Sequence, residues 1–334
     1  MATWLAILLL VVGFVCLVKG ADWFVDGAAG IAERLRVPQL VIGLTVVAFG
    51  TSAPELATSL ISSIGGDTGI AIGNIVGSNI TNILLILGVS SLICALPVEK
   101  NTLRIDFTVL IAVSGLLLLF GMDKTVQRWE GILLFVLSCV YTVILVVMAF
   151  KQRAKETIPT LENHEVTAEE TVAKKGFKAW YEGMKSRGWF LALITIVGLA
   201  IVVLGAQLAV EGATAIAVKL GISSRIIGLT VIAIGTSLPE LVTSVMAAAK
   251  GETDIAVGDI VGSCIFNIMR TIGLCATCVP LYFAPEFMID GAIALGAALL
   301  LAGLGWLKGN KIKRWGGIVM LLGFVAYYVY LFAL

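Results

Sequence analysis

Long apolar runs dominate the chain, and short polar segments separate them. A bilayer core about 30 Å thick needs roughly 20 apolar residues per helix, and runs of this length recur from the first residues to the last. The pattern predicts ten membrane-spanning helices, at about residues 2–18, 38–64, 69–95, 105–121, 130–150, 189–212, 223–249, 255–280, 287–306 and 315–334. The predicted fold class is an all-α polytopic membrane protein.

Composition agrees with this prediction. Of 334 residues, 59% are hydrophobic and 13% charged, which lies far outside the range of soluble domains. The first apolar run has no basic region before it, and residues 19–22 make a poor cleavage site, so we expect a retained helix rather than a signal peptide. The six cysteines all fall in apolar segments, which argues against a disulfide framework.

The distribution of lysine and arginine predicts the orientation. If the N-terminus lies outside, the inner connections hold 18 of the 23 basic residues, eight of them in residues 151–187. Cytoplasmic loops carry an excess of such residues. The sequence therefore predicts a multi-pass protein of the cell (plasma or inner) membrane, with both termini outside and a cytoplasmic linker at 151–187.

An internal repeat organises the chain. A shift of 185 residues aligns 12–88 with 197–273 without a gap, and 38 of the 77 aligned residues are identical. Because five predicted helices separate the copies, the second must be inverted in the membrane. We expect a first five-helix repeat at 1–150, the linker at 151–187 and a second, inverted repeat at 188–334. Inverted repeats are typical of transporters, whose substrate sites form near the midplane.

Each repeat places a glutamate directly after a proline within a long apolar run. The segments are GTSAPELATS at 50–59 and GTSLPELVTS at 235–244, and the acids are Glu55 and Glu240. A charge at the centre of a membrane costs about 3 kcal/mol or more, so an ion site is the first hypothesis.

Neighbouring groups add oxygen donors. Pro54 and Pro239 lack an amide proton, which frees backbone carbonyls one turn earlier. Hydroxyl groups on the same turns come from Thr51, Ser52, Thr236 and Ser237. Such hard oxygen donors suit Ca²⁺ and Na⁺ rather than soft metals.

A second motif is also duplicated, as GNIVGSNITNILLILG at 73–88 and GDIVGSCIFNIMRTIG at 258–273. Its paired polar residues lie four positions apart, so each pair shares one helix face: Ser78 with Asn82, and Ser263 with Asn267. The GxxxG spacing also allows close helix packing, and packing glycines with hydrogen-bonding neighbours are the alternative interpretation of the motif.

Together, the duplicated GTSxPE and GxIVGSxxxN motifs resemble the alpha repeats of the cation/calcium antiporter family, the sodium/calcium exchangers. The resemblance covers both halves. It implies four central cation sites lined by the two glutamates, hydroxyls, amides and backbone carbonyls, and a gate formed by the first helix of each half. The implied ligands are Glu55, Thr51, Ser52, Ser78, Asn82 and the Ala48 carbonyl, with Glu240, Thr236, Ser237, Ser263, Asn267 and the Ala233 carbonyl.

Several positions depart from that pattern or stay open. Potassium-dependent relatives resemble this chain but carry Asp where Asn267 stands, which argues against K⁺ co-transport. Asp259 replaces the asparagine of the first repeat and is a possible further cation ligand, or merely lies near the cytoplasmic mouth. Arg270 either faces the site as a tethered cation or extends towards the outer interface. Asp26 and Glu211 match across the repeats and are expected at helix ends.

The sequence predicts exchange of Ca²⁺ for Na⁺, with Ca²⁺ leaving the cell. A Ca²⁺/H⁺ antiporter is the nearest alternative, because buried glutamates can titrate, and a cation channel is a more distant one. An enzyme is not expected, because no catalytic motif is found. The expected partners are the two ions and the lipid bilayer; we expect no cofactor, nucleic acid or obligatory protein partner.

Overall fold

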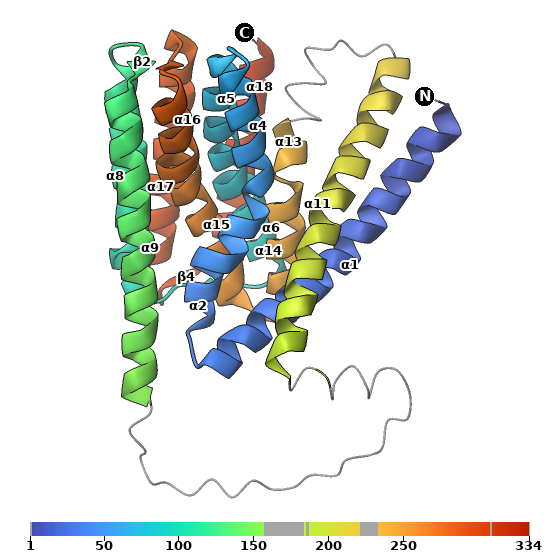
Figure 1. Cartoon of the computed structure of the whole chain (residues 1–334), viewed down its shortest axis with the longest axis vertical. Coiled ribbons are helices and arrows are strands. Elements are labelled where there is room, and N and C mark those ends of the chain that lie inside the picture. The colour runs from blue at the N-terminus through green and yellow to red at the C-terminus, as the bar shows by residue number, and fades with distance from the viewer. Residues whose placement is uncertain (1, 157–183, 185–186, 221–232, 308, 334) are drawn as a thin grey trace, which may run out of the picture.

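The computed structural model describes residues 2–156, 184, 187–220, 233–307 and 309–333. Helices make up almost all of it, and they stand side by side along one axis (Figure 1). The predicted linker at 151–187 lies largely outside the described residues, as does the start of the predicted span 223–249.

Two long helices, α1 (Thr3–Leu35) and α11 (Gly188–Lys219), pack against each other and run in opposite directions (Figure 1). Glycines make the close approach possible. A Cβ atom added at Gly13 would lie 2.6 Å from the Ala209 nitrogen, and one added at Gly198 would lie 2.6 Å from the Phe24 nitrogen. Because only glycine fits such contacts, the pair is held by backbone-to-backbone packing.

The remaining helices form a core in which each half contributes related elements. The first half supplies α2 (Gln39–Ile42), η1 (Gly43–Val47), α3 (Ala48–Thr51), α4 (Ala53–Ile64), α5 (Thr68–Ile80), η2 (Thr81–Leu87), α6 (Gly88–Ile93), α7 (Lys100–Arg104), α8 (Asp106–Gly121) and α9 (Arg128–Glu156). The second half supplies α13 (Ala233–Thr236), α14 (Leu238–Lys250), α15 (Thr253–Phe266), η4 (Asn267–Ile272), α16 (Gly273–Cys278), α17 (Pro285–Trp306) and α18 (Arg314–Ala333). Here η1, η2 and η4 are π-helical segments.

Four short strands join the two halves. β1 (Leu96–Pro97) pairs antiparallel with β4 (Lys311–Ile312), and β2 (Thr125–Val126) pairs antiparallel with β3 (Leu281–Tyr282). Each pair therefore links a loop of the first half to a loop of the second. The labels β2 and β4 lie near opposite ends of the helices in Figure 1.

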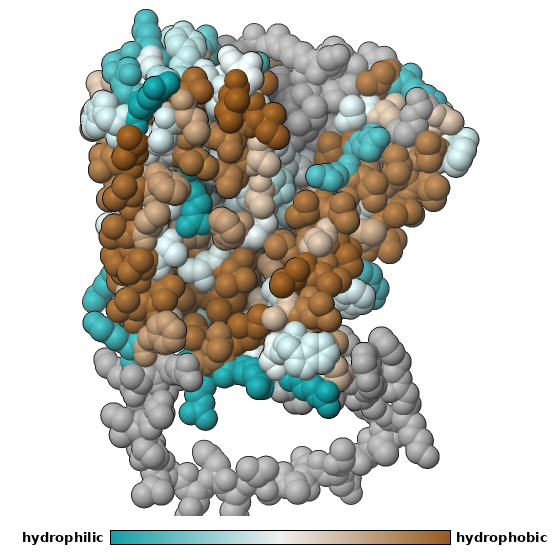
Figure 2. All heavy atoms as spheres, in the orientation of Figure 1, coloured by the Kyte–Doolittle hydropathy of each residue, from teal (hydrophilic) through white to brown (hydrophobic). Residues whose placement is uncertain are grey.

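The surface has the pattern of a membrane protein. Brown apolar side chains cover the middle of the face shown in Figure 2, and hydrophilic ones gather towards its two ends. Within the described residues, eight helices are long and apolar enough to cross a bilayer, and the bent pair Gln39–Thr51 and Ala53–Ile64 makes a ninth span if it is counted as one. This agrees with a polytopic helical fold.

The first helix of each half is longer than predicted, and α11 continues to Lys219 instead of ending near residue 212 and Glu211. The first apolar run was expected to end near residue 18, but α1 continues to Leu35. Asp26 therefore lies well inside a helix rather than at its end. The error arises because Asp22 and Asp26 interrupt the apolar run, while Lys250 of α14 compensates their charge from elsewhere in the sequence.

Candidate functional site

A break in the helix places each Pro-Glu motif at the start of a new helix. The chain leaves helical geometry at Ser52 (φ −80°, ψ 6°) and at Ser237 (φ −88°, ψ 6°), and α4 and α14 then begin with proline in the first turn. Proline is tolerated there because its missing N–H would be unpaired in any case. At the first break the two helices bend by 45°. Glu55 and Glu240 thus occupy the first turns of α4 and α14.

Both glutamates are completely buried, and serines of the opposite repeat hold them. Ser52 Oγ donates a hydrogen bond to Glu240 Oε1 at 3.0 Å, and Ser237 Oγ lies 3.4 Å from Glu55 Oε1. Among the described residues, Oε2 of each glutamate has no hydrogen-bond donor. A buried carboxylate oxygen without a partner is costly, so both oxygens are available to a cation.

Polar side chains of α5 and α15 lie on the same centre. Ser237 Oγ lies 3.3 Å from Ser78 Oγ, and Ser263 Oγ donates to the Ala48 carbonyl at 3.4 Å. Both amide atoms of Asn82 are buried and have no partner among the described residues. π-Helical turns are frequent at functional sites, and η2 carries Asn82.

Asn267 also lies at the centre, at the start of the related π-helix η4. Its Nδ2 donates to Asn79 Oδ1 at 3.1 Å, and its own Oδ1 has no partner among the described residues. Asn79 in turn donates to the Cys264 carbonyl at 3.1 Å. This bridge between the repeats joins Asn79 and Cys264, two positions that match across the repeats but carry different residues.

Two further clusters flank the glutamates and are related by the repeat. Thr51 Oγ1 donates to Asp259 Oδ1 at 3.0 Å, while Thr236 Oγ1 donates to Asn74 Oδ1 at 3.4 Å. Asp259 is completely buried. The structure therefore brings together nearly all of the predicted ligands, with Asp259 beside them. Ala233 begins α13, and no contact of its carbonyl is described.

Arg270 does not reach this centre. Its Nη2 donates to Thr142 Oγ1 of α9 at 3.2 Å, and its guanidinium lies over the rings of Phe49 and Phe266, at 4.8 and 4.4 Å from their centroids. Aromatic faces and a hydroxyl hold this charge, as a cation–π contact does. Within the described residues, Arg270 forms no ion pair with the buried carboxylates.

The donor set is dominated by neutral oxygens. In the described part of the chain, no three His, Cys, Asp or Glu side chains converge on one point. Hydroxyl, amide and carbonyl oxygens therefore supply most of the donors beside Glu55 and Glu240. Such a set can bind hard cations in adjacent subsites, but it does not form a cage for a transition metal.

Comparison with known proteins decides the family. The family model described as "Sodium/calcium exchanger protein" matches residues 5–147 and again residues 190–333. The chain belongs to the sodium/calcium exchanger family. The two matches agree with the duplication and inversion of the halves. As an exchanger, it belongs to a family of transporters rather than of enzymes.

Individual relatives match over nearly the whole chain. Sodium/calcium exchanger MaX1 of Methanosarcina acetivorans is 35% identical, and the match covers 97% of this chain and 98% of that one. Inner membrane protein YrbG of Escherichia coli is 33% identical over 98% and 97% of the two chains. A solved structure of the sodium-calcium exchanger NCX_Mj matches with a TM-score of 0.81 at 31% identity, over 98% and 99%.

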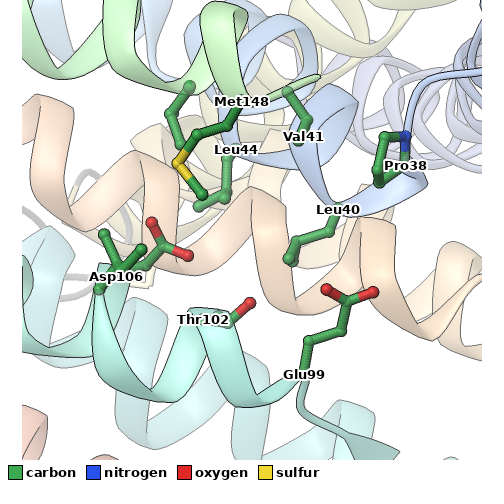
Figure 3. A pocket seen from close by; sticks show the side chains of 10 residues that line it. Pro38, Leu40, Val41, Leu44, Glu99, Thr102, Asp106 and Met148 are labelled. Atoms are coloured by element: carbon green, nitrogen blue, oxygen red, sulfur yellow. The ribbon is translucent and has the colours of Figure 1, made fainter. Parts of the chain in front are cut away.

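A buried pair of polar residues lies outside the predicted ligand set. Tyr141 of α9 donates to Asp106 Oδ1 of α8 at 2.7 Å. Asp106 and Thr102 line a cavity of about 20 Å³ beside α2, which has room for a single water molecule (Figure 3). The second half repeats the pair, since Tyr327 donates to Asp290 at 3.3 Å.

The sequence patterns did not point to every residue of these networks. Ser59 and Ser244 end the two Pro-Glu motifs and bind Asn74 and Asp259. Because both serines recur at the same place in the duplicated motif, the sequence could have identified them as site residues. The same holds for the two Asp–Tyr pairs, whose members match across the repeats at nearly the shift of the main alignment.

Proposed function

We propose that this protein is a secondary active antiporter that exchanges Ca²⁺ for Na⁺ by alternating access. The observation that best supports this is the arrangement of Glu55 and Glu240. Each is completely buried, accepts a hydrogen bond from a serine of the other repeat and keeps one oxygen unpartnered. Two carboxylates held in this way form one centre shared by the two halves.

The ions bind in adjacent subsites around this centre. Ca²⁺ takes six to eight oxygen ligands, which two glutamates alone do not supply. The proposed ligands are Glu55, Glu240, Thr51, Ser52, Thr236, Ser237, Ser78, Ser263, Asn82, Asn267 and the carbonyls of Ala48 and Ala233. Asp259, which accepts a hydrogen bond from Thr51, is a further candidate ligand.

Exchange follows from competition for the same oxygens. Ca²⁺ and Na⁺ have similar radii, so the two glutamates cannot serve both sets of ions at once. An uncompensated buried charge is costly, so the protein rearranges only when the site is neutralised. A carrier without ions therefore stays in place, and leakage is suppressed.

Two packing features support a proposed division into moving and fixed parts. α1 and α11 pack on each other through glycines, whereas the β1–β4 and β2–β3 pairs join the core helices of the two halves. We infer that the α1–α11 pair moves across a core that stays rigid. Rocking of one part against another around a fixed site is typical of inverted-repeat transporters.

We further propose ten spans, including 223–249, with both termini outside and residues 151–187 in the cytoplasm. This orientation rests on the excess of lysine and arginine in the inner connections. In a cell with an inward Na⁺ gradient, Ca²⁺ would leave. The protein needs no cofactor for this reaction, because the ion gradient supplies the free energy.

The decisive experiment measures ⁴⁵Ca²⁺ uptake into proteoliposomes loaded with Na⁺, with K⁺ or with a proton gradient. We expect uptake that requires internal Na⁺ and is lost in Glu55→Gln and Glu240→Gln. These variants keep the size and shape of the side chains, remove the charge and replace one acceptor oxygen by an NH₂ donor. Thermal stability in detergent shows whether they fold.

The alternatives give different results in the same assay. Uptake driven only by a proton gradient identifies a Ca²⁺/H⁺ antiporter. Uptake that needs no counter-ion and does not saturate identifies a channel. Either result would overturn the proposal, as would Na⁺-driven uptake that survives in both glutamine variants.

A further inference from the structure

The cavity beside the start of α2 is lined by polar side chains that the proposed exchange mechanism does not use (Figure 3). Glu99, Thr102 and Asp106 line it from the segment that forms α7 and the start of α8. Their spacing of three and four positions places them on one helix face. Leu40 and Leu44 of α2 and η1 line the other side. Three polar groups of one short segment therefore converge on one small space.

The two buried members of this group have oxygens that remain available. Asp106 is only 4% exposed, and Tyr141 donates to its Oδ1 at 2.7 Å, which leaves Oδ2 for the cavity. Thr102 is completely buried, and its Oγ1 has no hydrogen-bond partner among the described residues. In Figure 3 the Thr102 hydroxyl points into the space between Asp106 and Glu99. A buried hydroxyl without a partner costs about 1–3 kcal/mol, so the cavity is suited to a ligand from outside the chain.

Glu99 gives the cavity a second carboxylate and an opening to solvent. Glu99 is exposed, whereas Asp106 lies buried two helix turns further along the segment. When ionised, Glu99 repels Asp106 and also Asp254 at the start of α15. The basic residues of the same segment, Lys100 and Arg104, are exposed, and no ion pair compensates the three carboxylates among the described residues. The cavity therefore has a negative potential that attracts cations.

A water molecule accounts for only part of this arrangement. The cavity of about 20 Å³ has room for one water, which can donate to Asp106 and accept from Thr102. Water does not compensate the negative charges of Asp106 and Glu99. A divalent cation without its hydration shell is no larger, and it neutralises both charges and binds the free hydroxyl oxygen. Charge and size together favour a cation over water.

We propose that Glu99, Thr102 and Asp106 bind one hard divalent cation, Mg²⁺ or Ca²⁺, at a site separate from the transport centre. Carboxylate and hydroxyl oxygens suit such ions rather than soft metals. The protein supplies two carboxylates and one hydroxyl, so water that enters past Glu99 completes the coordination. Mg²⁺ is commonly held by one or two carboxylates with several waters, whereas Ca²⁺ takes six to eight oxygens.

A cation at this place would fix α7 and α8 against the start of the broken helix. From α2 that helix continues through η1 and α3 to Ala48 and Thr51, two proposed ligands of the transport centre. The bound cation therefore stabilises one wall of the core and is not itself transported. In the proposed orientation Glu99 faces the cytoplasm, whose divalent cations then determine the occupancy. The inference goes beyond the proposed function and does not depend on it.

Mn²⁺ binding to the full chain tests the site, because electron paramagnetic resonance distinguishes bound from free Mn²⁺. The starting protein carries Glu55→Gln and Glu240→Gln, which remove the charges of the two central glutamates. We expect it to bind Mn²⁺, and the further change Asp106→Asn to remove one bound Mn²⁺ per chain. The difference between these two proteins counts only ions that depend on Asp106. Competition with Mg²⁺ and with Ca²⁺ shows which ion the site prefers.

Two further variants leave the bond between Asp106 and Tyr141 in place and therefore test the site independently. Glu99→Gln and Thr102→Val should each raise the Mn²⁺ concentration needed for half-saturation several-fold. Ser114→Ala is the matched control for the lost hydroxyl, because Ser114 Oγ donates to a carbonyl within α8. It should leave Mn²⁺ binding unchanged.

The second half offers a control for the carboxylate. Asp290 accepts a hydrogen bond from Tyr327, as Asp106 does from Tyr141. Seven positions before Asp290, where the first half has Glu99, stands the completely buried Phe283. Asp290→Asn should therefore leave the bound Mn²⁺ unchanged. Mg²⁺ should also raise the thermal stability of the starting protein in detergent, and Asp106→Asn should remove that increase.

The inference is overturned if the starting protein binds no Mn²⁺, in which case the cavity holds only water. It is equally overturned if Asp106→Asn and Glu99→Gln bind as much Mn²⁺ as before. Thermal stability that responds to pH but not to divalent cations would assign a proton to Asp106 and would also reject the metal site. Failure of the proposed function is a separate result, because it appears as a lack of Na⁺-driven uptake in the unmodified protein.

Discussion

Lys250 Nζ lies 2.6 Å from Oδ1 of Asp22 and 2.6 Å from Oδ1 of Asp26, which ties the end of α14 to α1. The lysine also donates to the Asp22 carbonyl at 2.8 Å. A shift of 185 residues relates Lys250 to Gly65, so the other half has no lysine at this place. Among the described residues, this ion pair therefore has no lysine counterpart in the other half.

Removing this lysine should change the equilibrium between two arrangements of the α1–α11 pair. In one, α1 contacts α14 as in this structure; in the other, proposed for transport, α1 has moved away from α14. A partly exposed ion pair contributes up to about 1 kcal/mol, and such a loss changes an equilibrium roughly fivefold. We expect Lys250→Ala to increase the population in which α1 has left α14. Pulsed electron paramagnetic resonance between spin labels on these two helices measures that population.

Lys219→Ala is a suitable control, because Lys219 Nζ donates to Thr3 Oγ1 at the exposed ends of α11 and α1, away from α14. It should leave the distance distribution unchanged. Equal distributions for Lys250→Ala and the unmodified protein would show that the ion pair does not select an arrangement.

The serines that cross between the repeats should set the affinity for Ca²⁺. Ser52→Ala removes the hydroxyl donor of Glu240 Oε1 and a proposed ligand. Hydrogen bonds to charged groups contribute about 1.5–3 kcal/mol, which corresponds to roughly tenfold or more in affinity. Calorimetric titration of the purified protein with Ca²⁺ measures this loss. Ser63→Ala is the matched control, because Ser63 Oγ donates to the Ser59 carbonyl within α4 and is not a proposed ligand.

The glycines between α1 and α11 should be needed for transport. A Cβ atom at Gly20 would lie 2.8 Å from the Val202 nitrogen, and one at Gly205 would lie 2.8 Å from the Gly13 oxygen. Overpacking of this kind costs about 1–3 kcal/mol. We expect Gly20→Val and Gly205→Val to lose Ca²⁺ exchange and to lower thermal stability in detergent.

Gly77→Ala and Gly115→Ala provide the comparison, since no atom lies within 4 Å of a Cβ added at either position. If these variants lost as much activity as the α1 and α11 variants, general loss of glycine flexibility would explain the result. Close packing of the helix pair would then not be the cause.

The two buried Asp–Tyr pairs should contribute unequally to stability. Tyr141→Phe leaves Asp106 without its 2.7 Å donor beside the cavity shown in Figure 3, at a cost of about 2 kcal/mol. Tyr327→Phe removes a longer bond of 3.3 Å at a partly exposed site and should cost less. Thermal unfolding in detergent gives the order, and a reversed order would contradict this assignment.

Much of the site could be predicted because its residues occur in both repeats. Glu55 and Glu240 each follow a proline in an apolar run, and the structure places both in the first turn of a new helix. The repeat shift alone relates the two. Apolar length also predicted most helices, since the membrane imposes a minimum span.

The remaining errors and gaps come from contacts between distant residues. Asp26 was placed at a helix end, because nothing in its local sequence indicates that it pairs with Lys250, more than 200 residues later. The position of Arg270 stayed open for the same reason, and Thr142 and Phe49 decide it in the structure. Neither the Asp26–Lys250 contact nor the contacts of Arg270 can be recognised from the spacing of residues in the sequence.

The strand pairs β1–β4 and β2–β3 hold the two halves of the core together. Each connects residues of one half to residues of the other by backbone hydrogen bonds, independently of the covalent link between the halves. The covalent link between the two halves then ensures that both are synthesised in equal amounts, while the strand pairs hold them together. A gene cut between the two halves should therefore still yield a working protein when both pieces are produced in the same cell.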